Sequence, residues 1–419
     1  MEDQQKRADI KEPSDSLKIS EFMMDPEAAG PVIHLQPGDA NLSAPDEHTS
    51  EVNAALRRAL SECQPGPTGS QALIKVHIGE RKCETRMKPD YAPGASEFLQ
   101  ERGSQSVVAG DTTVAYTGPR GHEENPEDDS SAYLQLAAEH GWTADGPAGI
   151  PFVVLDRPET CRDRGFAFEQ PYQRTLVDNA GLFDDFHPAG GFLAADSVVN
   201  FAHLTLHGLA GVAGCMKSIA MGCAALPGKL RMHQSLLPEF DPARCERCGL
   251  CVAHCPVEAL TLPDEADVPR VNPDLCIGCG ECEAVCAPRN DAVTLEGKEI
   301  EDWTRGQNTL PVRMSDYVIG LMNGRWDDVV HVLHMYSITE RCDCLNTQQE
   351  PMITKDPGFL IGRNPFAVDR TGAAILRKEL EREGYDPGEE LLETADRAAE
   401  HVRNTYGIVS DLPVKEISL

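Results

Sequence analysis

The chain has 419 residues, of which 41% are hydrophobic, so it is long enough for two or three domains with a sizeable core. Its 68 acidic and 38 basic residues give a formal net charge of −30, which argues against nucleic-acid binding because phosphate contact needs clustered lysine and arginine. No run approaches about 18 consecutive apolar residues, and residues 1–20 contain no apolar signal segment, so neither a membrane span nor secretion is expected.

The N-terminal residues 1–70 are rich in proline, serine, aspartate and glutamate, and this composition predicts an acidic, partly disordered arm. One helical pattern stands out within it, at residues 48–63, with Thr49 or Ser50 as the N-cap. Residues 71–242 are expected to form the first part of an α/β domain.

Predicted strands and helices alternate from residue 72 onward. Hydrophobic periodicity predicts strands at 72–80, 105–113 and 150–157 and helices at 94–103 and 129–142. This order is typical of an α/β fold with a mostly parallel sheet and flanking helices. Functional residues of such folds lie at the carboxyl ends of strands. Asp111, Thr112 and Thr113 follow one predicted strand, and Asp156 follows another.

A glycine-rich stretch with paired histidines occupies residues 194–235. A predicted strand at 197–201 leads to His203 and His207, and a run of glycines then precedes Lys217. Backbone amides of a glycine-rich loop before a helix can bind an anion; the alternative is that the small residues allow close helix packing. For the two histidines, the alternative to a functional role is structural hydrogen bonding.

Eight of the 15 cysteines lie within 42 residues, in two runs that each have the spacing C-x2-C-x2-C-x3-C. This is the spacing of bacterial ferredoxins, in which the fourth cysteine of each run ligates the other cluster. We therefore predict two [4Fe-4S] clusters, one held by Cys245, Cys248, Cys251 and Cys286 and the other by Cys276, Cys279, Cys282 and Cys255. A disulfide framework would suit a short secreted chain, which this is not expected to be, and zinc sites usually show paired C-x2-C units.

The segment between the two runs, residues 257–275, is predicted to form a strand, a turn and a second strand. We therefore expect an inserted α+β ferredoxin-like domain at residues 243–297. Oxygen-sensitive clusters and unpaired thiols indicate a reducing cytoplasmic location.

The α/β domain is expected to resume over residues 298–419. Helices are predicted at 312–324, 370–386 and 390–407, and a buried strand at 328–338. Just past that strand, Cys342 and Cys344 flank Asp343. Two thiols one residue apart are candidates for an extra metal or redox site; the alternative is a pair of reduced thiols in packing.

Several separated segments of the chain together resemble the family known as domain of unknown function 362, over about residues 70–380. The similar segments are IKVHIGE, GDTTVAYTGPR, AHLTLHGLAGVAGCMKSIAMGCAALPGKLRMH, RCDC and NPFAVDRTGA. The resemblance implies a fold and the positions of motifs, with the ferredoxin unit inserted before the closing part. It implies no particular reaction.

These patterns favour a cytoplasmic iron–sulfur redox protein that passes electrons to a site on the α/β domain or to a partner enzyme, as a reductase or an electron-delivering activator. The predicted catalytic residues are His203, His207, Lys217 and Asp111, and the predicted anion-binding residues are Arg120 and Lys229. A redox partner protein and a small anionic substrate are expected. The alternatives are a plain ferredoxin-type carrier with a docking domain, or a non-redox enzyme with structural clusters.

Overall fold

The computed structural model describes most of the chain. The described residues are 17–18, 29–63, 69–116, 118–121, 124–126, 129–178, 181–208, 210–233, 236–255, 258–273, 275–276, 278, 280–297, 310–386 and 389–419. Among the described helices, none combines the length and apolar character that crossing a bilayer requires.

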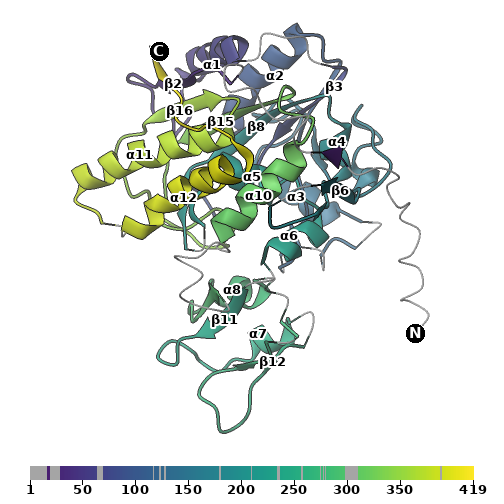
Figure 1. The fold of residues 1–419 in the computed structure, drawn as a ribbon, viewed down its shortest axis with the longest axis vertical. Helices are drawn as coiled ribbons and strands as arrows, with labels where there is room; N and C mark the ends of the chain where they lie inside the picture. The colour runs from purple at the N-terminus through teal and green to yellow at the C-terminus, as the bar shows by residue number, and fades with distance from the viewer. Residues whose placement is uncertain are drawn as a thin grey trace.

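A central sheet of eight strands organises the larger part of the molecule (Figure 1). Its order is β17 (Val414–Ser418), β2 (Val32–Gln36), β16 (Gly358–Gly362), β15 (Val329–Met335), β8 (Ser197–His203), β3 (Gln71–Lys75), β4 (Ser106–Asp111) and β5 (Phe152–Val154). Neighbouring strands pair in parallel except at β16, which is antiparallel to both β15 and β2. The predicted α/β fold with a mostly parallel sheet is therefore confirmed.

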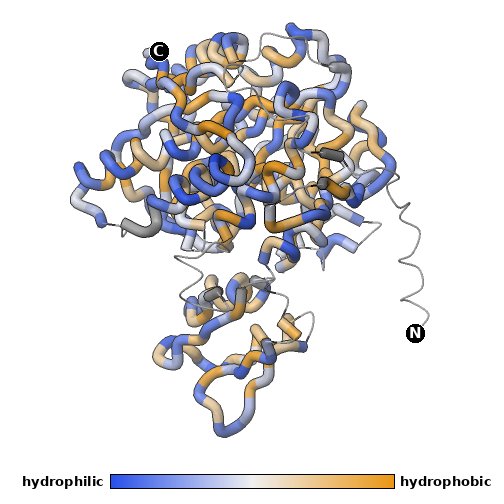
Figure 2. Tube along the Cα trace, in the orientation of Figure 1, coloured by the Kyte–Doolittle hydropathy of each residue, from blue (hydrophilic) through white to orange (hydrophobic). Residues whose placement is uncertain are grey.

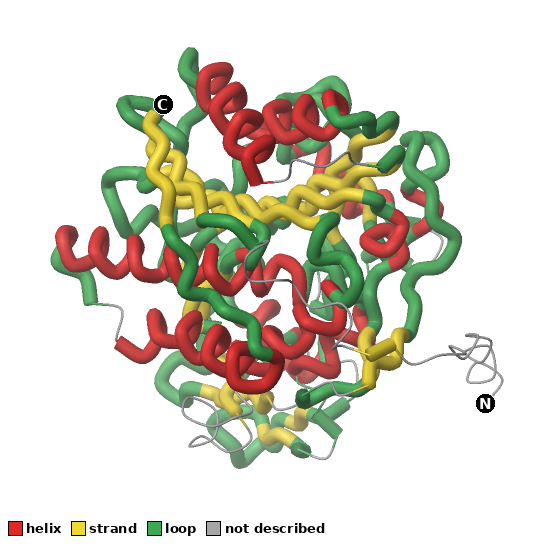
Figure 3. The backbone as a smooth tube through the Cα atoms, turned by 45° about the horizontal axis from the view of Figure 1, so that its top comes forward, coloured by secondary structure: helices red, strands yellow, loops and turns green. Residues whose placement is uncertain are grey.

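Helices cover both faces of this sheet (Figure 3). One face carries α1 (Thr49–Cys63), α2 (Ala92–Glu101) and α3 (Ser131–Glu139), whose apolar side chains share one core cluster. The other face carries α5 (Cys215–Ala220), α6 (Leu226–His233), α10 (Leu310–Met322), α11 (Pro365–Glu383) and α12 (Glu389–Tyr406). Because both faces are covered, β8 and β15 are buried along their whole length, as continuous hydrophobic strands of parallel sheets are. Figure 2 shows hydrophobic residues concentrated inside the larger body and hydrophilic residues at its periphery.

The remaining short elements lie in connections at the sides of the sheet. They are β1 (Leu17–Lys18), β6 (Thr175–Asp178), β7 (Asp185–Phe186), α4 (Gly190–Ala194), β9 (Thr205–His207), β10 (Gly211–Ala213) and the 3-10 turns η2 (Pro89–Tyr91) and η3 (Pro158–Thr160). β6 lies between β1 and β7 in a small separate sheet, and β9 pairs with β10.

The N-terminal segment departs from its prediction. Residues 29–63 do not form a separate arm, because β2 is a strand of the central sheet and α1 packs against that sheet. The helix expected at residues 48–63 is present as α1. The strand was missed because its few apolar residues are flanked by Pro31 and Pro37, and tertiary pairing rather than local sequence fixes it. The rest of the predicted arm lies largely outside the described residues.

The cysteine runs belong to a smaller lobe, which we call the cysteine lobe (residues 236–297; Figure 1). It contains two antiparallel pairs, β11 (Leu236–Phe240) with β14 (Val293–Gly297) and β12 (Leu260–Thr261) with β13 (Arg270–Val271), and two short helices, α7 (Leu250–Ala253) and α8 (Glu281–Cys286). The strand–turn–strand pattern predicted between the cysteine runs is present as β12 and β13. The lobe also starts earlier than predicted, because β11 pairs with its last strand.

Candidate functional site

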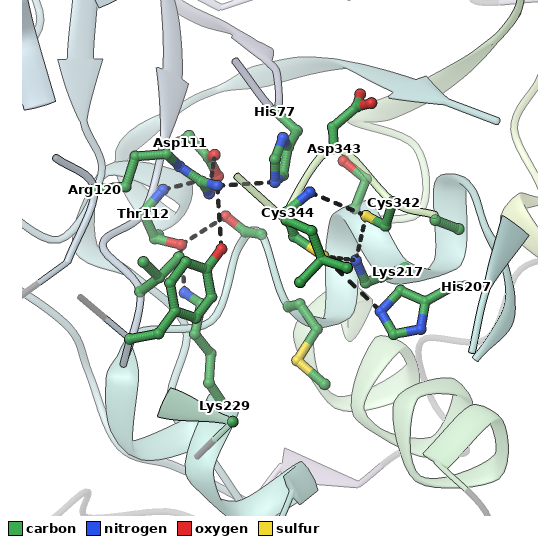
Figure 4. A pocket seen from close by; sticks show the side chains of 18 of the residues that line it. His77, Asp111, Thr112, Arg120, His207, Lys217, Lys229, Cys342, Asp343 and Cys344 are labelled. Carbon is green, nitrogen blue, oxygen red and sulfur yellow. Dashed lines mark hydrogen bonds and ion pairs between the residues drawn. The ribbon is translucent and has the colours of Figure 1, made fainter. Parts of the chain in front are cut away.

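A cavity of about 160 Å³ lies at the carboxyl edge of the parallel strands. The sheet domain contributes residues that follow β3, β4, β8 and β15, together with Lys217 on α5 and Lys229 on α6. The cysteine lobe contributes another part of the wall, with Gly280, Glu283 and Ala284 at α8. The cavity therefore lies between the sheet edge and the cysteine lobe. Figure 4 shows an ion-paired group around Asp111 on one side and the thiols with Lys217 and His207 on the other.

Asp111 is the centre of a buried charge network. Its carboxylate accepts bonds from Lys75 Nζ at 3.1 Å and from Arg120 Nη2 at 3.0 Å, and Arg120 also pairs with Glu80 at 2.9 Å. Burial opposes ionisation of Asp111, yet Lys75 and Arg120 hold its pKa below the usual range. Tyr133 donates a hydroxyl proton to the same carboxylate at 3.0 Å.

Arg120 was predicted to bind an external anion, but its guanidinium is engaged within the chain. All three guanidinium nitrogens have partners: Tyr133 at Nε, Glu80 and His77 at Nη1, and Asp111 at Nη2. Its role in this structure is to neutralise buried carboxylates. The signal that could have indicated this is the pairing of acidic and basic residues at the ends of two neighbouring predicted strands.

The cavity retains positive charge from two lysines. Lys229 Nζ donates to Thr112 Oγ1 and to the Ala224 carbonyl oxygen, and burial lowers its pKa to about 8. Lys217 Nζ lies 3.0 Å from Cys342 Sγ and 3.7 Å from Cys344 Sγ. Burial would lower the pKa of Lys217, but the two neighbouring sulfurs raise it. Both side chains are therefore charged near neutral pH.

The two thiols after β15 occupy one tight turn. The Leu345 amide donates to the Cys342 carbonyl oxygen at 3.1 Å, which closes the turn over Asp343 and Cys344. A hydrogen bond from Cys344 and the Lys217 ammonium lower the pKa of Cys342 against the opposing effect of burial. The hydrogen bond to Cys342, together with burial, raises the pKa of Cys344. The Lys217 ammonium and the hydrogen bond therefore favour negative charge on Cys342 over Cys344.

His203 is held by two acceptors of the chain. Its Nδ1 lies 2.7 Å from Asp343 Oδ2 and its Nε2 lies 2.7 Å from the Tyr336 carbonyl oxygen. Because both partners accept, both ring nitrogens carry protons. Burial alone would lower the pKa of His203, but Asp343 and the two hydrogen bonds raise it. His203 therefore fixes the thiol turn through Asp343, and both of its ring nitrogens are occupied by acceptors of the chain.

Replacing His203 with glutamine should destabilise the protein by about 3 kcal/mol at pH 6, because Asp343 becomes a buried charge without its counter-ion. The raised pKa of His203 means that its contribution is complete below the unfolded value of about 6.5 and is lost as pH rises through the higher folded value. Urea unfolding midpoints of the wild type and His203→Gln should therefore differ more at pH 6 than at pH 9. An equal difference at both pH values would contradict the ion pair.

His207 and the two thiols form a compact group. The ligand atoms of His207, Cys342 and Cys344 all lie within 4.8 Å of one another. A metal-bound imidazole usually donates its other N–H to an acceptor, but here the Ala210 amide donates to His207 Nδ1 at 3.2 Å. The Lys217 ammonium also lies against Cys342. These contacts favour protonated side chains over a bound metal ion. The three ligand atoms are nevertheless close enough together to hold a metal ion.

The glycine-rich stretch does not form the predicted anion-binding loop. β9 and β10 pair as an antiparallel hairpin, and α5 follows directly. The first amides of α5, of Cys215 and Met216, donate to the Asp369 carboxylate at 2.7 and 2.8 Å. A Cβ on Gly214 would lie 2.4 Å from an Asp369 oxygen, so glycine is needed for this approach. The anion at this helix end is a side chain of the protein itself.

The cysteine lobe consists of two similar halves. Gly249 and Gly280 adopt φ values of 74° and 82° and begin α7 and α8, each one residue after the second cysteine of its run. Arg247 and Gly278, which both precede that second cysteine, are also left-handed, with φ values of 52° and 66°. Both halves therefore repeat one backbone path around their cysteines. Cys279 lies outside the described residues.

The fourth cysteines of the two runs are also alike. The Ala259 amide donates to Cys255 Sγ and the Ala292 amide donates to Cys286 Sγ, both at 3.2 Å. Burial raises the pKa of Cys286, and the neighbouring Cys248 and Cys245 thiols raise it further. The last cysteine of the second run therefore interacts electrostatically with two cysteines of the first run.

The family model described as "Domain of unknown function (DUF362)" matches residues 72–374 of this chain. The chain belongs to this family. The predicted DUF362 resemblance is thus confirmed, and every residue that lines the cavity lies inside the matched range. The matched range also contains the whole cysteine lobe.

Other comparisons add little to the DUF362 assignment. A search of curated proteins found no match. One solved structure, a crystal structure of a Thermotoga maritima protein from a structural genomics consortium, matches with 7% identity and a TM-score of 0.34. That alignment covers 84% of this chain, and the chain spans 59% of the length of that structure.

The DUF362 cavity unites most of the predicted site residues. His203, His207, Lys217, Asp111, Cys342, Cys344, Arg120 and Lys229 all line it. Two residues that line the cavity, Lys75 and Asp343, were not among the predicted site residues, and Glu80 joins them through its ion pair with Arg120. Glu80 and Asp343 lie at or after the carboxyl end of a predicted strand, and that position was the available signal, whereas Lys75 lies within one.

Proposed function

We propose that this chain is an iron–sulfur redox protein whose cysteine lobe binds two [4Fe-4S] clusters and delivers electrons to the cavity or to a partner enzyme, as a reductase or an electron-delivering activator. The observation that carries the proposal is the position of the lobe. Gly280, Glu283 and Ala284 of the second cysteine run help to line the same cavity as Lys217 and the two thiols. Bound clusters of this kind supply one-electron transfer.

The described part of the lobe fits such clusters. Both fourth cysteines accept a backbone N–H at sulfur, and such bonds are among the features that tune cluster potentials. Cys245, Cys248, Cys251 and Cys286 would hold one cluster, and Cys276, Cys279, Cys282 and Cys255 the other. Asp291 of the lobe also pairs with Arg341 at 2.7 Å, next to the thiol turn. That ion pair supports a fixed approach of the lobe to the cavity.

The sheet domain contributes the chemistry of the cavity itself. Lys217 and Lys229 place positive charge among apolar side chains such as Leu230 and Leu295, which suits a small anionic substrate. The pKa of Cys342 is lowered and that of Cys344 is raised by their hydrogen bond, and His207 Nε2 lies 4.0 Å from Cys344 Sγ. A docking domain without chemistry of its own would not need two cavity lysines, one of them beside a thiol pair. This favours a reductase over a plain electron carrier.

Anaerobic iron and sulfide analysis of the purified full chain tests the proposal. We expect about eight irons and eight sulfides per chain, as two cubane clusters require, and an electron paramagnetic resonance signal after dithionite reduction. Stoichiometric zinc in place of iron, or a chain without sulfide, would contradict the proposal. A full trace-metal scan on the same sample identifies any further ion.

A further inference from the structure

The turn Cys342–Asp343–Cys344 has the arrangement of a redox-active dithiol. Its two sulfurs lie within 4.8 Å of each other, and one residue separates them within a closed turn. Disulfide formation requires the sulfurs to approach to about 2.05 Å, which side-chain rotation within such a turn can supply. Cys342 is 6% exposed and lines the cavity, so a molecule that enters the cavity can reach it.

A redox-active dithiol needs one sulfur that attacks the substrate and a second that resolves the mixed disulfide, and the surroundings of the two thiols differ accordingly. Lys217 Nζ lies 3.0 Å from Cys342 Sγ and 3.7 Å from Cys344 Sγ, so the ammonium stabilises negative charge chiefly on Cys342. The Cys344 amide also lies 3.4 Å from Cys342 Sγ and donates to it. Cys342 is therefore the attacking sulfur, and Cys344 is the resolving thiol beside it.

Polar contacts of Asp343 also hold the turn in place. Asp343 accepts a bond from His203 Nδ1 at 2.7 Å and a bond from Cys83 Sγ at 3.3 Å, and its backbone oxygen accepts the Glu80 amide at 3.1 Å. The middle residue therefore points into the protein while the two cysteines face Lys217. A packing pair of reduced thiols would not need this set of polar contacts.

We propose that Cys342 and Cys344 form a dithiol that reduces a small anionic disulfide bound in the cavity. The anionic character follows from Lys217 and Lys229, which both reach the cavity. Arg120 is already occupied by carboxylates of the chain. Reduction of the Cys342–Cys344 disulfide back to the dithiol uses electrons from the cysteine lobe, and this step rests on the proposed function of the lobe.

The reaction balances without a further co-reactant. The Cys342 thiolate attacks one sulfur of R–S–S–R′, forms a mixed disulfide with R–S and releases R′–S⁻. The Cys344 sulfur then attacks Cys342 Sγ and releases R–S⁻, and the Cys344 proton passes to one of the two released thiolates. The products are the Cys342–Cys344 disulfide, one thiol and one thiolate. Two electrons and one proton restore the thiolate and the thiol.

One tryptic peptide allows a direct test. Residues 342–355 lie between Arg341 and the cleavage site at Lys355, and they contain both cysteines of the turn and no other. The full-length, as-purified protein is treated anaerobically with dithiobis(nitrobenzoate), an anionic disulfide. We expect the wild-type peptide to lose two hydrogens, and we expect the Cys344→Ser peptide to keep a nitrothiobenzoate adduct on Cys342. Adducts on both wild-type cysteines, or an unreacted peptide, would overturn the proposal.

The role of Lys217 is tested with neutral iodoacetamide. The initial alkylation rate of Cys342 at pH 6 should fall roughly tenfold in Lys217→Met, because Lys217 helps to hold the pKa of Cys342 at about 5, and a rise of about two pKa units would lower the thiolate fraction at pH 6 about tenfold. Lys217→Arg should retain most of the rate. Lys415→Met removes an exposed lysine charge that does not line the cavity, and it should leave this rate unchanged. Equal rates in wild type and Lys217→Met would remove the basis for Cys342 as nucleophile.

Other titratable groups also surround the turn, and all are retained in these variants. They are His207 on β9, His203 on β8, Tyr116 and Cys83 in loops after β4 and β3, Glu283 on α8 and Asp343 within the turn. The comparison of Lys217→Met with Lys217→Arg isolates the lysine charge from this set.

Substrate charge is tested with a matched pair of disulfides. Dithiobis(nitrobenzoate) carries carboxylates, whereas dithiodipyridine is uncharged. Lys229→Met should slow formation of the Cys342–Cys344 disulfide by the anionic reagent and leave the uncharged reagent unaffected. Equal effects on both reagents would contradict anion recognition in the cavity.

Metal analysis distinguishes the dithiol from a metal site at the same two cysteines. It also separates failure of the dithiol from failure of the proposed function of the lobe. A further zinc or iron ion that is lost in Cys344→Ser would make the pair a metal site and overturn the dithiol. A normal iron and sulfide content with no disulfide in the peptide would overturn the dithiol alone. Disulfide formation in a chain without clusters would leave the dithiol standing and contradict the proposed function of the lobe.

Discussion

Cys286→Ser should remove the same cluster as Cys251→Ser, although the two cysteines belong to different runs. The reason is the exchange of fourth ligands, which the proximity of Cys286 to Cys245 and Cys248 supports. Each variant should fall from about eight to about four irons per chain, and the electron paramagnetic resonance signal that remains should be the same in both. Cys282→Ser should remove the other signal, and so should Cys255→Ser.

Cys63→Ser provides the matched control for these variants. Cys63 is a partly buried thiol at the end of α1, outside both cysteine runs. Its replacement should change neither the iron content nor either signal. If Cys286→Ser and Cys282→Ser lost the same signal, each run would ligate its own cluster, and the exchanged arrangement would be wrong.

Arg120→Met should destabilise the sheet domain by about 3–5 kcal/mol or more, because it leaves two buried carboxylates without their shared counter-ion. Arg120, Glu80 and Asp111 are each at most 3% exposed, so water cannot replace the lost contacts. Urea unfolding followed by circular dichroism measures the effect. Adding Glu80→Gln should recover part of the loss, since Asp111 keeps its ion pair with Lys75 and Glu80 is the carboxylate that loses its counter-ion.

Arg57→Met is the matched surface control for this prediction. Arg57 also pairs with two carboxylates, Glu97 and Glu101, but all three side chains are 35–58% exposed. Its removal should change the free energy of unfolding by no more than about 1 kcal/mol. A similar loss in both variants would mean that burial does not govern the stability of the Asp111 network.

Residue spacing and hydrophobic periodicity were sufficient to predict much of the fold. The strands that became β3, β4, β8 and β15 are continuous hydrophobic segments, and a parallel sheet collects their carboxyl ends at one edge. The position of Asp111 at that edge could therefore be predicted. So could the grouping of the cysteine runs, because ligand spacing is a property of a short stretch of chain.

Partners of charged groups could not be predicted in the same way. His203 and Asp343 are separated by 140 residues, and their contact depends on the pairing of β8 with β15. Arg120 was predicted to bind an external anion, but the fold places the carboxylates of Asp111 and Glu80 against its guanidinium. β2 and β16 are short, and only their mutual pairing and the packing of α1 and α11 establish them as strands.

The two halves of the cysteine lobe are alike in backbone but unequal in surroundings. Gly280, Glu283 and Ala284 of one half line the cavity, whereas the other half carries Cys248, which is exposed. In the proposed electron transfer, the half at the cavity would be the exit and the half with the exposed Cys248 the entry. Two halves with the same backbone path set no direction of electron flow, so the direction would follow from how the lobe is joined to the sheet domain.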